Sequence, residues 1–171
     1  PLVGEHNAFN ATAAVAVAVA LGASWDSALE VLPEIEAPRG RLQPVHRTDD
    51  DIRVFVDYAH TDDALVNVLA GVRPTVPPGA KLVVVFGAGG DRDRSKRPRM
   101  LKAALGGADR VVVTSDNPRT ENPDAIVAEI VSEAATADLA RTVCEVDRRT
   151  AIASAIGGAD AGDVLVIAGK G

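Results

Sequence analysis

The chain has 171 residues, of which 47% are hydrophobic, so we expect one folded domain, or one domain with part of another, rather than a disordered chain. Aromatic residues make up only 3% and the formal net charge is −6, which argues against base-stacking platforms and general nucleic-acid binding. No apolar run is long enough to cross a bilayer, no signal peptide is visible, and a single cysteine excludes an internal disulfide or a Cys-based zinc site. We therefore expect a cytoplasmic protein without a nucleic-acid or membrane partner.

The first part of the chain predicts two helices. Residues 8–21 are rich in alanine, which favours a helix, and Ser24 is a suitable N-cap for a second, shorter helix that Pro33 stops. Pro33, Pro38 and Gly40 mark the stretch that follows, and this pattern is typical of a linker. We place a domain boundary there and divide the chain into residues 1–37 and 38–171.

Strands and helices then alternate. Strands are predicted at 52–57, 81–86, 110–114, 142–146 and 164–168, and helices at 62–72, 98–105, 123–135 and 147–156. The strands are nearly continuous runs of valine, isoleucine and leucine, which is typical of parallel strands buried on both faces. The sequence predicts an α/β fold: a Rossmann-like, mostly parallel sheet with helices on both faces, preceded by a short helical remnant of another domain.

Polar or glycine-rich loops follow four of these strands. They are residues 57–61 (DYAHT), 87–94 (GAGGDRDR), 115–120 (SDNPRT) and 169–171 (GKG). Ligands of open α/β sheets bind beyond the carboxyl ends of the strands. Six cations also lie close together in this otherwise acidic chain, which indicates a small anionic ligand: Arg92, Arg94, Lys96, Arg97, Arg99 and Lys102.

Each candidate residue also has a structural interpretation. The Asp57 carboxylate either accepts hydrogen bonds from two ribose hydroxyls or caps the N-terminus of the next helix. His60 either contacts a nucleotide or is a polar loop residue without a ligand. Residues 87–90 let a ligand approach the backbone, or they belong to a solvated loop whose cations are neutralised by nearby aspartates. The pattern Gly-x-x-x-x-Gly-Lys-Ser/Thr of a phosphate-binding loop does not occur in this sequence.

The turn at Asn117-Pro118-Arg119 presents an amide and a guanidinium together, which suits a ligand that carries both a donor and a carboxylate. Its structural interpretation is an Asx turn before the next helix. Cys144 is expected to be a small buried hydrophobe and Trp25 to pack one helix against its neighbour.

Taken together, these strings resemble the Mur ligases of bacterial cell-wall synthesis. The resemblance runs through GEHNAFN at 4–10, Gly40-Arg41, DYAHT at 57–61 and GKG at 169–171. GAGGDRDRSKRP at 87–98 and DNPR at 116–119 narrow it to the members that add meso-diaminopimelate to UDP-N-acetylmuramoyl-alanyl-glutamate.

The resemblance implies a parent with three domains, of which this chain holds the last helices of the central ATPase domain (1–37) and most of the C-terminal domain (38–171). The family's phosphate-binding loop, magnesium ligands and carbamylated lysine belong to the central domain. The fragment alone is therefore expected to be inactive, with no catalytic or metal-binding residue of its own.

The resemblance also assigns site residues. The nucleotide site would be formed by His6, Asn7, Asn10, Arg41, Asp57, Tyr58 and His60. The amino-acid site would be formed by Arg92, Asp116, Asn117, Arg119 and Gly169. ATP with Mg²⁺, meso-diaminopimelate and the UDP-linked dipeptide would be its small-molecule partners, and the parent would be a monomer.

Three alternatives stay open. The first is a Mur ligase that adds lysine, the second a folylpolyglutamate-type ligase, and the third a nucleotide-binding module without enzymatic activity. The Asn117-Pro118-Arg119 turn argues against the first two. Tight ATP binding by the isolated chain would favour the third.

Overall fold

A six-stranded sheet organises the molecule. The computed structural model describes residues 2–47 and 49–169, without the side chains of Glu5 and His6. The strand order is β1-β2-β6-β3-β4-β5. The strands are β1 (Gln43–Pro44), β2 (Arg53–Asp57), β3 (Leu82–Phe86), β4 (Arg110–Val113), β5 (Thr142–Cys144) and β6 (Val164–Ala168). All neighbours pair in parallel except β1, which runs antiparallel to β2 at one edge.

Helices follow the strands in turn: α3 (Asp62–Val72), α4 (Lys96–Gly107), α5 (Pro123–Ile130), α6 (Thr136–Leu139) and α7 (Arg148–Gly157). Short 3-10 segments lie at Leu32–Glu34 and Arg73–Thr75. Side-chain oxygens of Thr61, Asn122 and Asp147 accept backbone N–H groups at the starts of α3, α5 and α7.

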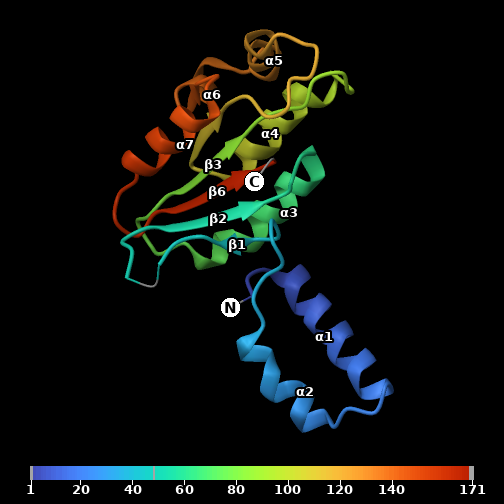
Figure 1. Ribbon diagram of the computed structural model, residues 1–171. Coiled ribbons are helices and arrows are strands. Elements are labelled where there is room, and N and C mark those ends of the chain that lie inside the picture. Colours follow the sequence, from blue (N-terminus) through green and yellow to red (C-terminus); the bar gives the residue numbers. More distant parts are fainter. Residues whose placement is uncertain (1, 48, 170–171) are drawn as a thin grey trace.

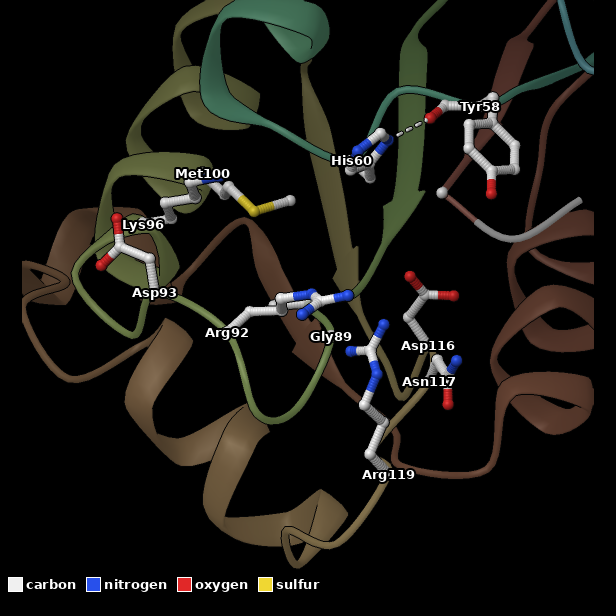
Figure 2. A pocket seen from close by; sticks show the side chains of 12 residues that line it. Tyr58, His60, Gly89, Arg92, Asp93, Lys96, Met100, Asp116, Asn117 and Arg119 are labelled. Carbon is white, nitrogen blue, oxygen red and sulfur yellow. Dashed lines mark hydrogen bonds between the residues drawn. The ribbon is translucent and has the colours of Figure 1, made fainter.

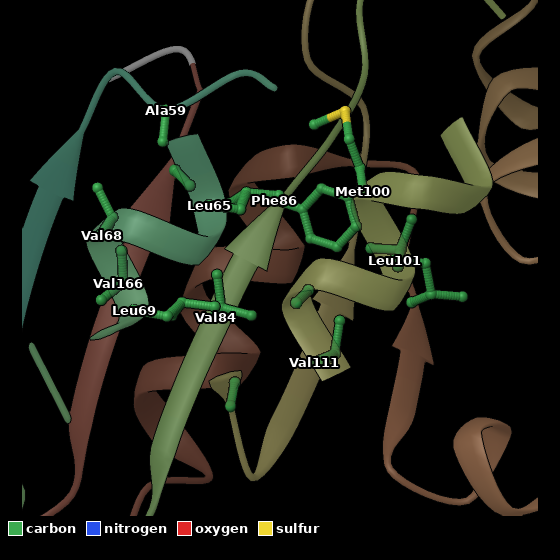
Figure 3. Packing of buried hydrophobic residues seen from close by; sticks show 14 of the residues in the cluster. Ala59, Leu65, Val68, Leu69, Val84, Phe86, Met100, Leu101, Val111 and Val166 are labelled. Atoms are coloured by element: carbon green, nitrogen blue, oxygen red, sulfur yellow. The ribbon is translucent and has the colours of Figure 1, made fainter. Parts of the chain in front are cut away.

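The alternation of side chains along each strand builds two cores. On one face Phe55, Val84 and Val111 pack beneath α3, α4 and α5, as Figure 3 shows for part of this cluster. On the other face Val83 and its neighbours pack against Ala151 and Ala155 of α7. The small alanine side chains let α7 approach the sheet closely. The prediction of a mostly parallel sheet with helices on both faces is confirmed.

The N-terminal helices form a hairpin that projects away from the sheet (Figure 1). These are α1 (Glu5–Ala20) and α2 (Trp25–Val31), and Ser24 caps α2 as expected. Large apolar side chains of the hairpin face solvent: Phe9 is 68% exposed and Leu21 84%. The expectation that Trp25 packs between helices is wrong, because its side chain is 57% exposed. None of the described helices is long and apolar enough to span a membrane.

Several boundaries differ from those expected. The helix expected at 123–135 ends at Ile130, where Val131 leaves helical geometry, and a separate short helix begins at Thr136. Strand β5 stops at Cys144, which lies exposed at the sheet edge rather than in the core. Helix α4 begins at Lys96, two residues before the start expected at residue 98. Pro98 is tolerated inside the helix because a residue of the first turn has no intrahelical acceptor for its N–H group. Strand β1, with only two residues, gave no sequence signal.

Candidate functional site

The four parallel strands β2, β6, β3 and β4 end at one edge of the sheet, and their loops enclose a cavity of about 630 Å³ (Figure 2). Its described lining consists of Tyr58, His60, Ala88, Gly89, Arg92, Asp93, Lys96, Met100, Asp116, Asn117, Arg119 and Gly169. Seven of the residues expected in a site are therefore brought together here: Tyr58, His60, Arg92, Asp116, Asn117, Arg119 and Gly169.

Two arginines reach the cavity from neighbouring loops. Arg92 lies in the loop between β3 and α4, and Arg119 in the loop between β4 and α5; their guanidinium groups lie close to each other in Figure 2. Arg119 donates one hydrogen bond to the Gly90 carbonyl oxygen, and its backbone is left-handed, with φ of 51°. A guanidinium carries five N–H donors, so Arg119 can bind a carboxylate while this bond persists.

The end of β6 closes the cavity beside the β4 loop. Gly169 has φ of 93°, and a Cβ added there would lie 3.3 Å from Asp116 Oδ2. Arg148 of α7 donates to the carbonyl oxygens of Ser115 and Ala168, and so fixes these two strand ends relative to each other. Burial lowers the pKa of Arg148 from its usual range.

Two aromatic rings form the opposite side of the cavity. The rings of Tyr58 and His60 meet edge to face, with centroids 5.4 Å apart, and His60 Nδ1 lies 2.9 Å from the Tyr58 carbonyl oxygen. Tyr58 is 57% exposed, so its ring is available to a planar group.

Asp93, Lys96 and Met100 also line the cavity. Lys96 was expected only as one of the six cations near an anionic ligand, and Asp93 and Met100 were not expected in the site. Their signal was their place in the sequence, because Asp93 lies in the β3–α4 loop and the other two lie on the first turns of α4. Hydrogen bonds from the Ser95 side chain and backbone lower the pKa of Asp93, so this carboxylate stays charged beside Lys96.

Asp57 is occupied by the fold itself. Its buried carboxylate accepts the backbone N–H groups of Leu42 and Ala59, both at 2.8 Å. The alternative that Asp57 caps α3 is wrong, because the cap is Thr61. A role for Asp57 at a ribose stays a prediction.

The remaining nucleotide residues do not line this cavity in the described part of the chain. Arg41 and Asn10 are exposed, and Asn7 is buried with its amide donating to the Val3 carbonyl oxygen. The side chain of His6 lies outside what the structure describes. Their assignment to a nucleotide stays a prediction.

The described residues hold no group of three or more His, Cys, Asp or Glu side chains that could bind a metal ion. Of the carboxylates at or near the cavity, Asp93 accepts hydrogen bonds from Ser95, Asp91 from Thr120 and Glu121 from Arg97. The described residues therefore offer no cage that would hold magnesium through protein side chains alone.

Comparisons of the chain with a family model, with curated relatives and with solved structures agree with one another. The family model described as "Mur ligase, glutamate ligase domain" matches residues 40–171. The UDP-N-acetylmuramoyl-L-alanyl-D-glutamate–2,6-diaminopimelate ligase of Thermosynechococcus vestitus is 48% identical over all of this chain, which covers 34% of that protein. The chain thus spans about a third of the length of the curated relatives it matches.

Solved structures agree with this likeness. The structure of a ligase of that same name superposes with a TM-score of 0.75 and 43% identity over all of this chain and 34% of the other. The folylpolyglutamate synthase of Mycobacterium tuberculosis, solved with ADP and AMPPCP, gives a TM-score of 0.71 and 26% identity over 99% of this chain and 38% of the other.

Proposed function

The chain belongs to the Mur ligase family, and from this premise we propose that its full-length protein adds meso-diaminopimelate to UDP-N-acetylmuramoyl-L-alanyl-D-glutamate. The reaction consumes ATP and serves peptidoglycan synthesis. Residues 38–171 are the C-terminal domain that receives the amino acid, and residues 1–37 are the last helices of the ATPase domain.

The observation that carries the proposal is the meeting of Arg92, Asn117 and Arg119 in one cavity. Meso-diaminopimelate differs from lysine at its far end, where it has a carboxylate beside the ammonium. Recognition of that end needs a cation of fixed geometry, which a guanidinium supplies through paired N–H donors. Lysine would leave such an arginine without its partner in a partly desolvated site, and so would be rejected.

The proposed chemistry forms an amide through an acyl phosphate. The glutamyl carboxylate attacks the γ-phosphorus of ATP and ADP leaves; the amine of diaminopimelate then attacks the acyl carbon, and inorganic phosphate leaves. The part of this chain is to bind and orient the amine for that second step. Closure of the domains around it would exclude the water that hydrolyses an acyl phosphate.

For the nucleotide we propose contacts from Tyr58 and His60, whose rings lie at the rim of the cavity, and from Asp57 and Arg41 near the linker. His6, Asn7 and Asn10 would contact the adenine. Magnesium would be held by the part of the protein that precedes this chain. We further propose a cytoplasmic monomer, in keeping with ATP and a UDP-linked precursor as substrates.

Arg119→Ala in the full-length enzyme tests the substrate assignment. We expect the KM for diaminopimelate to rise by about 10- to 100-fold, from the loss of a charged hydrogen bond worth about 1.5–3 kcal/mol. The KM for ATP should stay near its starting value, and selectivity over lysine should fall by a similar factor. Steady-state phosphate release with each amino acid measures both.

Arg149→Ala is the matched control, because Arg149 is an exposed arginine that does not line the cavity. If Arg119→Ala kept the preference for diaminopimelate over lysine, the turn would not select the substrate and a lysine-adding ligase would become the better assignment. Tight ATP binding by residues 1–171 alone, measured by calorimetry, would instead favour a nucleotide-binding module.

A further inference from the structure

Arg97 is a buried arginine outside the cavity. It lies in the first turn of α4 with only 1% of its side chain exposed, and its guanidinium lies between two carboxylates of the β4–α5 region. Its Nη2 and Nη1 donate to the two oxygens of Glu121 at 2.9 and 3.0 Å, and Nη1 also donates to Glu129. A buried ion pair adds little stability beyond what well-packed apolar side chains give.

Glu121 connects the Arg97 guanidinium to both substrate loops. It follows Arg119 by two residues, and its Oε1 also accepts the backbone N–H of Asp91 at 2.6 Å, next to Arg92. Arg97 Nη2 itself lies 3.4 Å from the Gly89 carbonyl oxygen. One buried guanidinium is thus joined, directly or through one carboxylate, to the loops that carry Arg92 and Arg119.

The two loops also interlock with each other. The Gly90 N–H donates to the Asn117 carbonyl oxygen at 2.9 Å, and the Asp91 carboxylate accepts from the Thr120 hydroxyl at 2.7 Å. A Cβ on Gly90 would overlap the Pro118 carbonyl oxygen, so the backbones are in close contact there.

Both loops hold a residue in a costly conformation. Asp91 and Arg119 are non-glycine residues with φ of 53° and 51°, in the left-handed region. Such conformations persist only where surrounding contacts determine them. The Arg97–Glu121 pair, of which neither residue lines the cavity, supplies such contacts to both loops.

We propose that Arg97, acting through Glu121, is a positioning residue that sets the geometry of the Arg92 and Arg119 pair and thereby the selection of the amino-acid substrate. The inference rests on the proposed function, which assigns that pair to the substrate. A purely structural Arg97 would hold α4 against α5 and would affect every amino acid equally.

Arg97→Lys in the full-length enzyme separates these roles, because lysine keeps the charge but its single ammonium cannot bind both oxygens of Glu121 and Glu129 in the same geometry. We expect the ratio of kcat/KM for diaminopimelate to that for lysine to fall by about 10-fold or more, since misplacement of a binding group by about 1 Å can cost about 100-fold. The KM for ATP should not change.

Glu129→Gln is the matched control. It weakens the same ion cluster, but Glu129 binds Arg97 and Arg94 and makes no described hydrogen bond to the backbone of either loop. We expect this variant to lose stability and to keep the selectivity ratio. Hydrogen exchange by mass spectrometry should show faster exchange of segments 87–95 and 115–122 in Arg97→Lys than in Glu129→Gln.

An unchanged ratio in Arg97→Lys, with lower kcat for both amino acids, would overturn the inference, and so would an equal change of the ratio in Glu129→Gln. If Arg97→Lys does not fold, Glu121→Gln replaces it with the same expected outcome. Failure of the proposed function looks different, because the unmodified enzyme itself would then show no preference for diaminopimelate.

Discussion

Asp57 has a structural role that is separate from its proposed contact with a ribose. Its two carboxylate oxygens hold the N–H groups of Leu42, in the linker, and Ala59, in the loop that leads to the cavity. Leu42 is itself fully buried with φ of 45°, and the Tyr58 N–H donates to the Gly40 carbonyl oxygen beside it. Asp57 therefore fixes the linker to the end of β2.

We expect Asp57→Asn to destabilise the protein by about 1–3 kcal/mol, because its amide group cannot accept both buried N–H groups and leaves one of them without an acceptor. Denaturant unfolding monitored by circular dichroism measures this. The ribose role predicts in addition a rise in the KM for ATP of about 10- to 150-fold. A loss of stability with unchanged KM would leave Asp57 with its structural role alone.

At the scale of elements, an ion cluster joins α4 to α5 and to the loop that precedes α5. Hydrogen bonds from the Arg97 side chain, and next from the Asp91 backbone, lower the pKa of Glu121 from 4.5 to about 2. The Arg94 side chain also pairs with Glu121 and Glu129. The cluster lies at the N-terminus of α4, so protonation of Glu121 would affect the same contacts that hold the loops of Arg92 and Arg119.

A carboxyl group whose pKa is lower in the folded state stabilises that state at pH values above its unfolded pKa. Its contribution is lost as the pH falls from about 4.5 toward 2. We expect the stability difference between the unmodified protein and Glu121→Gln to be constant near neutral pH and to shrink through this window. Urea unfolding at a series of pH values measures it. A difference that stays constant down to pH 2 would contradict the lowered pKa.

At the scale of the whole molecule, the hairpin of α1 and α2 is packed far less than the sheet domain. Val15, at 6% exposed, is the one buried apolar residue in the described part of the hairpin, while Phe9, Leu21 and Trp25 are exposed. Its exposed apolar side chains agree with the proposal that the hairpin belongs to a separate domain.

We expect deletion of residues 1–37 to change the Tm of the chain by no more than a few degrees, because the two cores on the sheet gain little from the hairpin. Aggregation should fall, because exposed apolar surface is removed. Thermal unfolding and light scattering of residues 38–171 and 1–171 test this. A much lower Tm for 38–171 would show that the hairpin belongs to the same folding unit.

The sequence by itself determined the class of the fold and the edge of the sheet where the site lies. Continuous apolar strands alternating with helices specify a parallel sheet, and polar loops after four strands identify the edge at which those strands end together. The motifs at 87–98 and 116–119 identified the family and the residues of the cavity, because these short strings specify local backbone and side-chain chemistry.

Only the tertiary structure decided how these parts combine. Sequence patterns did not show that Arg97 is buried against Glu121 and Glu129, because the burial of a charged residue depends here on partners 24 and 32 positions away. Nor did they show that Asp57 holds the linker, since Leu42 is brought to it by the antiparallel edge strand β1. Local sequence sets the period and ends of elements, whereas the partner of a buried polar group is set by the packing of the whole chain.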